Sequence, residues 1–331
     1  MISSAIPLDL GSVGVIGGGI NSLCIASALA QRGWQGDLFE RGKCLQQTSS
    51  VSTKLLHGGL RYLEQGHLAL VAESLRERGL WLRDAPEHCR WLPLLLPIYE
   101  NRRRPAWQWQ LGLGLCNWVL RQALGMGVEL HEDCPVQRIT TTGLLQLENG
   151  RLHQFDWLVN GAGPWAAQLL ECSGIPSNVK LELVRGSHLL VPVPEGLKLP
   201  HHGLFVEVCG SARIAFLLPY QSQLLVGTTE EVQSLGQSIE ASGSERELLW
   251  QLVEQHLPAF GAAARSRGRF FSGLRPIVSI SSTGKTNISS ASRDSLFRRQ
   301  DRLITVFGGK WTTARSLAER LLHTAPFNGQ T

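Results

Sequence analysis

The chain has 331 residues and a formal net charge of +5, with 43% hydrophobic and 18% charged residues. At ~100–200 residues per domain this length suggests two domains, and the apolar content excludes a disordered chain because it supports a sizeable core. The modest positive charge suits an anionic ligand or an acidic membrane surface, whereas no dense basic arm indicates nucleic acid as a partner.

Seven cysteines are scattered without a CxxC pair, so the spacing typical of zinc or iron–sulfur sites is not found and no metal is expected. Their odd number, and an N-terminal segment Met1–Leu10 without the pattern of a signal peptide, favour reduced thiols and a cytoplasmic location. No run reaches the ~18–20 apolar residues that a spanning helix needs. We therefore expect a protein that does not cross a membrane, although it can lie on one.

The first forty residues have the pattern of a βαβ unit. A β-rich run Ser12–Ile16 is followed by three glycines, an apolar helical segment Ile20–Ala30 and a second strand Asp37–Glu40. Gly33 suits the end of the helix. Two strands joined by a helix predict a parallel sheet.

The glycines between the first strand and the helix are typical of dinucleotide binding. They let the backbone turn tightly and approach a pyrophosphate at the helix N-terminus, where Gly17, Gly19, Ile20 and Asn21 are the candidates. Glu40, 23 residues after Gly17, ends the second strand, where its carboxylate can accept hydrogen bonds from a ribose. The alternative is an ordinary glycine turn. Ser22 occupies the third position of the motif, usually Gly or Ala, and predicts a slightly looser helix–strand contact.

The remaining elements indicate an α/β protein with two domains. We expect a Rossmann-like discontinuous domain from 1–90, 119–177 and 268–327, and a smaller domain with an antiparallel sheet from 91–118 and 178–267. Asn149-Gly150 is a strong hairpin signal. The expected elements, in chain order, are a helix Leu68–Asp84, a strand Val128–Leu130, a hairpin of Leu144–Leu147 and Leu152–Phe155, a strand Trp157–Val159, a strand-rich stretch Leu181–Thr229, a helix Glu245–Leu257, a strand Leu303–Phe307 and a helix Thr312–His323.

The run Thr48–Glu64 resembles the flavin-dependent glycerol-3-phosphate dehydrogenases, within the wider D-amino-acid-oxidase-like flavoprotein superfamily. The resemblance continues, in order along the chain, in Asn160–Trp165, Arg185–His188 with Val191-Pro192, Pro219-Tyr220, Gly227–Glu230, Gly273–Pro276 and Phe307–Arg315. It implies that the Rossmann-like domain binds FAD. No cysteine lies near Gly308–Arg315 or within Gly273–Pro276, so we expect the FAD to be bound non-covalently.

The resemblance also implies further cofactor-binding residues. Ser49 and Ser50 offer hydroxyls to a pyrophosphate and ribityl chain, although a polar surface loop has the same composition. His57 and Gly58 bring backbone close to a flat ring. Gly308 and Gly309 can present amides to the flavin N1–C2=O region, unless they form only a β-to-α turn. The set is completed by Lys54, Gly163 and Thr312.

For the substrate, the resemblance implies oxidation of sn-glycerol 3-phosphate to dihydroxyacetone phosphate, with hydride passing from C2 to flavin N5 and electrons to a quinone. Arg61, Arg275 and Lys310 are the candidates for binding the phosphate, with Tyr62 beside Arg61. His188 is the candidate for accepting the hydroxyl proton, and we count His188, Arg275 and Lys310 as catalytic. A core histidine with a satisfied hydrogen bond is the alternative for His188.

Arg102–Arg104 followed by Trp107, Trp109 and Trp118 suits a contact with an anionic membrane, and a solvated basic loop beside core tryptophans explains the same residues equally well. The chain also departs from the family pattern. It lacks an aspartate-rich stretch after this segment and the C-terminal helical domain, and Ala314 replaces a common tyrosine.

Two rival functions remain at this stage: an oxidase or dehydrogenase of an amino or hydroxy acid on the same scaffold, and a trimmed flavin-binding remnant without activity. The electron acceptor and the oligomeric state stay open.

Overall fold

The computed structural model describes residues 10–56, 68–89, 91–95, 127–208, 213–279, 295–324 and 326–327. The chain forms two compact units. Unit 1 combines residues 1–50, 115–182 and 276–331, and unit 2 combines residues 51–114 and 183–275. The chain passes from unit 1 to unit 2 within strand β9 (Lys180–Pro192) and returns within strand β14 (Arg269–Ser279).

Unit 1 is built on a six-stranded sheet in the order β15-β16-β8-β1-β2-β4. Neighbouring strands from β16 to β4 run parallel, and β15 is antiparallel to β16. Val13 and Val15 of β1 are fully buried, as expected of a parallel strand covered on both faces. The strands are β1 (Ser12–Ile16), β2 (Gln35–Phe39), β4 (Glu129–His131), β8 (Trp157–Asn160), β15 (Ser295–Gln300) and β16 (Leu303–Gly308).

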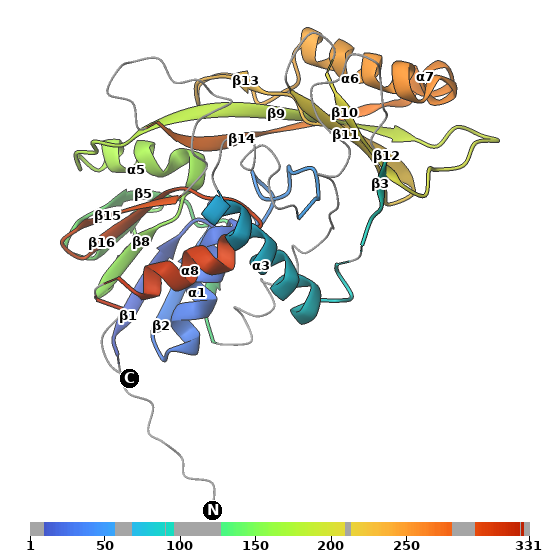
Figure 1. Cartoon of the computed structure of the whole chain (residues 1–331). Coiled ribbons are helices and arrows are strands. Elements are labelled where there is room, and N and C mark those ends of the chain that lie inside the picture. Colours follow the sequence, from blue (N-terminus) through green and yellow to red (C-terminus); the bar gives the residue numbers. More distant parts are fainter. Residues whose placement is uncertain are drawn as a thin grey trace, which may run out of the picture. The chain divides into compact units, whose positions relative to one another are not determined.

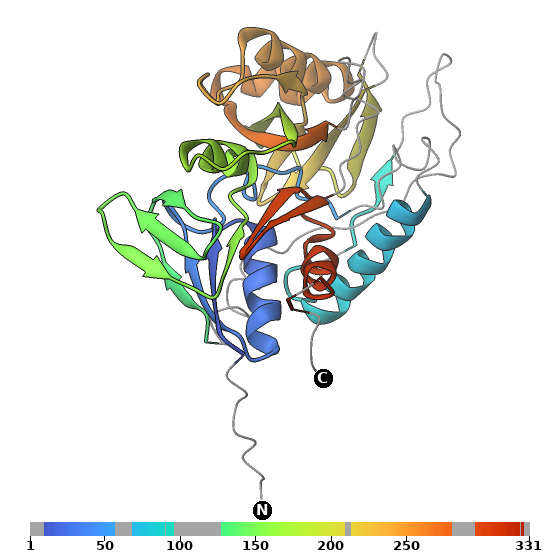
Figure 2. The same ribbon diagram turned by 90° about the vertical axis from the view of Figure 1, so that its left-hand side faces the viewer.

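Two helices pack together on one face of this sheet, α1 (Ile20–Gln31) and α8 (Ala314–Leu322) (Figure 1). A three-stranded antiparallel sheet of β5 (Val136–Ile139), β6 (Leu144–Leu147) and β7 (Leu152–Gln154) lies on the other side (Figure 2).

A hydrophobic cluster that includes Phe39, Leu145, Leu158 and Phe307 joins this small sheet to the large one. Helix α5 (Ala166–Cys172), which follows the short 3₁₀ helix η2 (Gly163–Trp165), contributes Leu169 and Leu170 to the same cluster.

Unit 2 contains a sheet in the order β13-β9-β12-β11-β10-β3, with β14 paired to β9. Strands β9 to β13 pair antiparallel, and β3 is parallel to β10. The unit also contains the helix α3 (Leu68–Asp84). The other strands are β3 (Leu94–Leu95), β10 (Gly203–Glu207), β11 (Ile214–Tyr220), β12 (Gln223–Gly227) and β13 (Glu231–Val232).

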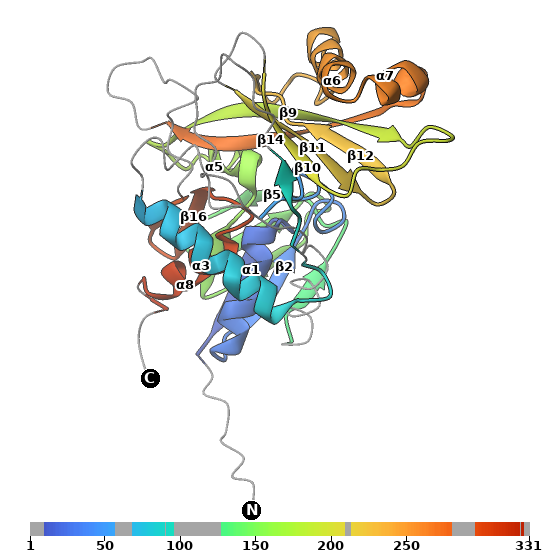
Figure 3. The same ribbon diagram turned by 45° about the vertical axis from the view of Figure 1, so that its right-hand side comes forward.

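Alternate side chains of β9 serve two different cores. Leu189 and Val191 pack with Leu249 and Trp250 of helix α6 (Gly243–His256), whereas Leu190 packs in a separate cluster with Leu92, Leu218 and Leu225. Helix α7 (Pro258–Ala264) and the 3₁₀ turn η3 (Arg265–Arg267) follow α6, and Figure 3 shows α6 and α7 along one face of the sheet. This alternation follows from the two-residue period of a strand.

The expected elements of the βαβ unit, the hairpin and the last strand and helix are present, with ends that differ by at most two residues. The division of the chain differs from expectation mainly at 51–90, which belongs to unit 2, and by a few residues at two boundaries among the described residues, where 178–182 belongs to unit 1 and 268–275 to unit 2. The reason is packing: Leu55 joins the cluster around Leu190, and Thr53 Oγ1 lies 3.3 Å from His188 Nε2. Across the described residues, no helix combines the length and the apolar content needed to span a bilayer.

The small sheet of unit 1 provides a test of this packing. Leu145 is completely buried on β6, whereas Leu152 at the start of β7 is 60% exposed. Leu145→Ala should lower the free energy of unfolding by about 2–5 kcal/mol because it leaves a cavity. Leu152→Ala should change it by less than about 0.5 kcal/mol. Chemical denaturation followed by circular dichroism makes the comparison, and equal losses would show that the cluster is not packed as described.

Candidate functional site

The glycine-rich loop after β1 lies against the end of β8. Gly17 has a φ of +97°, and a Cβ built on it would stand 2.8 Å from the carbonyl oxygen of Gly161. Both the conformation and the space require glycine here. The backbone of the loop can therefore approach a ligand without a side chain in between.

Glu40 is tied to the same loop. Its Oε2 accepts a hydrogen bond of 2.5 Å from the backbone N–H of Gly18, and its Oε1 accepts one of 3.0 Å from Gly42. The residue is 7% exposed. A carboxylate has about four lone-pair positions, so Glu40 can accept ribose hydroxyls while it stays fixed by the two amides.

The first turn of α1 contacts two other segments of unit 1, the loop that carries Ser49 and the loop after β8. Ser49 Oγ accepts a hydrogen bond of 3.0 Å from the backbone N–H of Ile20, directly after the N-cap residue Gly19. Ser22 is fully buried and donates a hydrogen bond of 3.0 Å to the carbonyl of Gly161. The hydroxyl of Ser22 therefore ties the first turn of α1 to the loop after β8.

Asn21 connects this turn to the end of β16. Its Nδ2 donates to the carbonyl of Gly308 at 3.4 Å, and a Cβ on Gly309, whose φ is +97°, would stand only 2.5 Å from the same nitrogen. Its Oδ1 is buried and has no hydrogen-bond partner among the described residues. A buried amide oxygen without a donor is costly. Together with the close-approach glycines, it fits a bound group that supplies a hydroxyl donor, as the ribityl chain and riboses of FAD do.

The other predicted cofactor residues are placed as follows. Ser50 Oγ lies within hydrogen-bond distance of the carbonyls of Gln46 and Gln47, at 3.0 and 2.8 Å, so its hydroxyl is engaged with its own loop. Gly163, with a φ of +56°, begins η2, and Thr312 is 8% exposed beyond Gly309. Lys54 belongs to unit 2. The predicted residues His57, Gly58, Arg61 and Tyr62 lie outside the described residues, as does the segment Arg102–Trp118.

In unit 2, His188 of β9 is 2% exposed. Its Nε2 lies 3.3 Å from Thr53 Oγ1, and its ring stacks on Phe271 with centroids 5.0 Å apart. Burial, together with the positive charges of Arg275 and Lys54, lowers the pKa of His188 to about 3. The imidazole is therefore neutral at physiological pH and is able to accept a proton. It becomes a stronger base when a negative charge offsets the two cations.

Arg275 of β14 is the other predicted substrate residue in unit 2. Its Nη2 donates a hydrogen bond of 2.9 Å to the carbonyl of Thr229, and its Nη1 lies 3.6 Å from Glu230 Oε1. A Cβ on Gly186 would stand 2.7 Å from that Nη2, so the absence of a side chain at Gly186 makes room for the guanidinium. Lys310 follows β16 in unit 1.

Phe271 and Glu245 were not anticipated from the sequence. The stacking of Phe271 on His188 has no sequence signal, because the two residues lie on different strands. The spacing of Ser242 and Glu245 is that of a capping box and could have predicted the cap of α6, but not the bonds of Glu245 to Arg185, Ser187 and Thr229.

One group of potential metal ligands occurs in the described part of the chain, at Asp37, Glu129 and His131. His131 Nε2 lies 3.6 Å from Asp37 Oδ2 and 3.7 Å from Glu129 Oε1. Glu129 is exposed.

The model of the family described as FAD dependent oxidoreductase matches residues 12–114 and 109–321. The chain belongs to this family. FAD is accordingly its cofactor, and the predicted flavoprotein oxidoreductase is confirmed at that level.

Several proteins are similar to this chain over most of its length. Glycerol-3-phosphate dehydrogenase of Pseudomonas aeruginosa is 32% identical, over 94% of this chain and 70% of the relative. D-erythritol 1-phosphate dehydrogenase of Brucella abortus is 30% identical, over 93% and 72%. The structure of glycerol-3-phosphate dehydrogenase from Bacillus halodurans with FAD has a TM-score of 0.73 at 22% identity, over 96% of this chain and 64% of that one. This likeness confirms the predicted fold class.

Acid precipitation tests whether FAD is bound non-covalently. It should release yellow FAD into the supernatant, and flavin retained in the pellet would contradict non-covalent binding.

The Glu40 carboxylate gives a direct test of the cofactor site. Glu40→Ala should cost one charged hydrogen bond, ~1.5–3 kcal/mol, and so raise the Kd for FAD roughly 10- to 150-fold. Titration of the apoprotein with FAD measures this. Glu148→Ala, in the exposed β6–β7 turn, should leave the Kd unchanged, and an unchanged Kd for Glu40→Ala would remove Glu40 from the site.

The buried imidazole predicts a pH dependence of stability. The pKa of His188 falls from 6.5 to about 3 on folding, so between these values the unfolded chain binds a proton that the folded chain excludes. The free energy of unfolding should then fall as the pH drops through this window, by ~1.4 kcal/mol per pH unit.

Between pH 7 and pH 5 the parent should therefore lose ~2 kcal/mol more stability than His188→Gln. Urea unfolding at both pH values measures the difference, with exposed His202→Gln as a control that should follow the parent. Identical pH dependence in the parent and His188→Gln would show that the folded protein does not exclude the proton.

Proposed function

We propose that this flavoprotein oxidises sn-glycerol 3-phosphate to dihydroxyacetone phosphate and passes the electrons to a quinone. The observation that carries the proposal is the pairing, within unit 2, of a guanidinium with a buried neutral imidazole, Arg275 and His188. Support also comes from the similar proteins of Pseudomonas aeruginosa and Brucella abortus, whose names both specify a phosphorylated polyol.

Arg275 supplies the charge that recognises the phosphate. Its present ionic partner is Glu230 at 3.6 Å, a separation longer than a hydrogen bond. A phosphate that carries close to two negative charges can compete with one carboxylate for a guanidinium, since it accepts two parallel N–H bonds with more charge. The family resemblance adds Lys310 and Arg61 as further cations proposed to bind the phosphate.

His188 takes the proton. In the proposed reaction the C2–H bond breaks as hydride, the hydroxyl proton moves to the imidazole, and the C2–O bond becomes a carbonyl. FAD, when bound, supplies the two-electron acceptor for that hydride. Burial, together with the positive charges of Arg275 and Lys54, keeps the imidazole of His188 neutral. A bound dianion would offset the two charges, so substrate binding itself would raise the basicity of His188.

The quinone and a peripheral position on the inner surface of the cytoplasmic membrane belong to the same proposal. They are supported by the family resemblance and by the arginines and tryptophans of Arg102–Trp118, whose composition suits an anionic lipid surface.

A second candidate is oxidation of an amino or hydroxy acid, in which Arg275 would bind a carboxylate. One guanidinium is enough for a carboxylate, whereas three predicted cations are more than it needs. A substrate without phosphate distinguishes the two functions.

The phosphate contact predicts a selective loss of activity. Arg275→Ala should lower kcat/KM for glycerol 3-phosphate by roughly 30- to 1000-fold, because a cation–dianion contact is worth ~2–4 kcal/mol. Lys310→Ala and Arg61→Ala should behave alike, and Arg275→Lys should not restore full activity. Assays with an artificial electron acceptor measure this, with FAD content unchanged.

Two comparisons control this experiment. Arg269→Ala, at the exposed start of β14, should leave kcat/KM unchanged. Glycerol should be a poor substrate for the parent and should lose little further in the variants. Equal losses for glycerol and glycerol 3-phosphate would mean that these residues serve the flavin or the fold, and the second candidate would then be preferred.

A further inference from the structure

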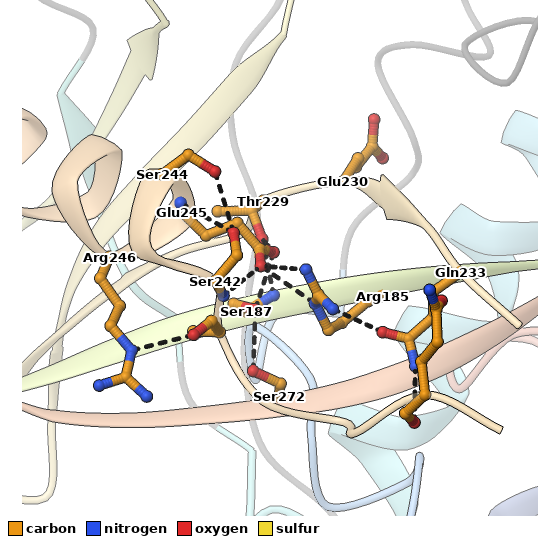
Figure 4. Close-up of polar contacts among 12 residues, drawn as sticks. Arg185, Ser187, Thr229, Glu230, Gln233, Ser242, Ser244, Glu245, Arg246 and Ser272 are labelled. Atoms are coloured by element: carbon orange, nitrogen blue, oxygen red, sulfur yellow. Dashed lines mark hydrogen bonds and ion pairs between the residues drawn. The ribbon is translucent and has the colours of Figure 1, made fainter. Parts of the chain in front are cut away.

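The first turn of helix α6 contains a buried carboxylate, that of Glu245, which accepts hydrogen bonds from strand β9, from Thr229 and from the residue before the helix, Ser242 (Figure 4). The side chain of Glu245 is 1% exposed. Its Oε1 accepts hydrogen bonds from Ser187 Oγ at 2.9 Å and Thr229 Oγ1 at 2.5 Å. Its Oε2 accepts from the Ser242 backbone N–H at 2.8 Å and from Arg185 Nε and Nη2 at 3.0 and 2.5 Å.

This carboxylate is ionised in the folded protein. Burial alone would favour the neutral acid, but the hydrogen bonds from Thr229, Ser242, Arg185 and Ser187 outweigh it and lower the pKa of Glu245. Its charge is balanced by Arg185, whose third nitrogen, Nη1, donates to Gln233 at 2.6 Å. Arg185 is therefore committed to the interior network, and the recognition of an anionic substrate falls to other cations of the unit.

The hydrogen bonds continue from Glu245 to the two proposed substrate residues. Thr229 Oγ1, which donates to Glu245, accepts from the Ser187 backbone N–H at 2.8 Å, and the Thr229 N–H donates back to the Ser187 carbonyl at 3.1 Å. The carbonyl of Thr229 accepts from Arg275 Nη2. Ser187 immediately precedes His188, so one carboxylate fixes the backbone that presents the imidazole and the backbone that holds the guanidinium.

We propose that Glu245 is a positioning residue for substrate recognition, acting on Arg275 through Thr229 and on His188 through Ser187. This inference rests on the function proposed above. A helix cap alone would need only the reciprocal bonds of Ser242 and Glu245, and it leaves the bonds to Arg185, Ser187 and Thr229 without a role. A displacement of about 1 Å in a group that orients substrate can cost ~100-fold in rate, which sets the scale of the expected effect.

The first test uses the holoenzyme with glycerol 3-phosphate and an artificial acceptor. Glu245→Gln keeps the size of the side chain but replaces the charged carboxylate that accepts hydrogen bonds from Arg185 with a neutral amide. It should lower kcat/KM roughly 10- to 100-fold, mainly by raising KM. Thr229→Val should do the same because it removes the linking hydroxyl, whereas Thr229→Ser, which keeps the hydroxyl, should retain most of the activity.

Ser242→Ala is the matched control. It removes the side-chain cap of α6 and should lower the Tm, because a lost cap costs ~1 kcal/mol, but it should leave KM unchanged. If Ser242→Ala raises KM as much as Glu245→Gln does, Glu245 is only a helix cap and the proposal is overturned. If Glu245→Gln does not fold, the comparison of Thr229→Val with Thr229→Ser decides in the same way.

A double-mutant comparison identifies the route. If Glu245 acts through Arg275, Glu245→Gln should change KM little once Arg275 is alanine. If the effects of Glu245→Gln and Arg275→Ala on KM multiply in the double mutant, the link from Glu245 to Arg275 is overturned. Binding of inorganic phosphate to the holoprotein, measured by calorimetry, separates the two levels of inference. Phosphate binding that depends on Arg275 but not on Glu245 overturns the positioning role alone. Phosphate binding coupled to both residues, without turnover of glycerol 3-phosphate, supports the positioning role and overturns the proposed substrate.

Discussion

The backbone contact between the ends of two adjacent parallel strands organises unit 1. The loop after β1 touches the loop after β8 so closely that Gly17 has no room for a Cβ beside the Gly161 carbonyl, and Ser22 closes the contact with a hydrogen bond to the same carbonyl. The N-terminus of α1 can present its amides only because the loop lies this deep. The glycine turns also fix two neighbouring side chains. Glu40 accepts a hydrogen bond from the Gly18 N–H, and Asn21 donates one to the Gly308 carbonyl.

Two arginines of unit 2, Arg185 and Arg275, lie near carboxylates in different ways. Arg185 and Arg275 both come from motifs shared with the flavin-dependent dehydrogenases, and both have carboxylate neighbours. Arg185 bonds directly to a buried, ionised glutamate, whereas Arg275 lies 3.6 Å from its acid. A buried pair in direct contact is expensive to break because it leaves an uncompensated charge. An incoming anion could compete more easily for the guanidinium of Arg275 than for that of Arg185, which agrees with the role proposed for Arg275.

The spacing of apolar residues predicted the bounds of the helices and strands well where a single helical or strand period runs through the segment. The helix Leu68–Asp84 and the strand Ser12–Ile16 have the predicted bounds, and the Asn149-Gly150 turn joins β6 to β7. The 13-residue strand β9 was seen only as part of a strand-rich stretch, since its two faces pack in different cores and its sequence shows no alternation.

The candidate site was predictable only as a set of motifs. The motifs pointed to Glu40 in unit 1 and to His188 and Arg275 in unit 2, but the environment of each residue depends on residues far away in the sequence. Glu245 finds its partners 16, 58 and 60 residues away, and Thr53 meets His188 across 135 residues. No local pattern reports such contacts. The expected helix start at Glu245 concealed the buried role of this carboxylate, because an acid in a first turn usually faces solvent and the helix dipole explains its presence.

The place of β16 in the sheet has a consequence for biosynthesis. This strand pairs with β8 and carries β15 on its other side, and Asn21 in the first helix reaches Gly308 across 287 residues. A ribosome emits only about 5–20 residues per second, so one side of β8 stays unpaired for many seconds until β16 has been synthesised. During that interval unit 2, whose two segments are complete once Arg275 has emerged, can fold first. Chains interrupted before β16 has emerged should therefore carry an unpaired edge of β8, an open sheet edge that chaperones can recognise.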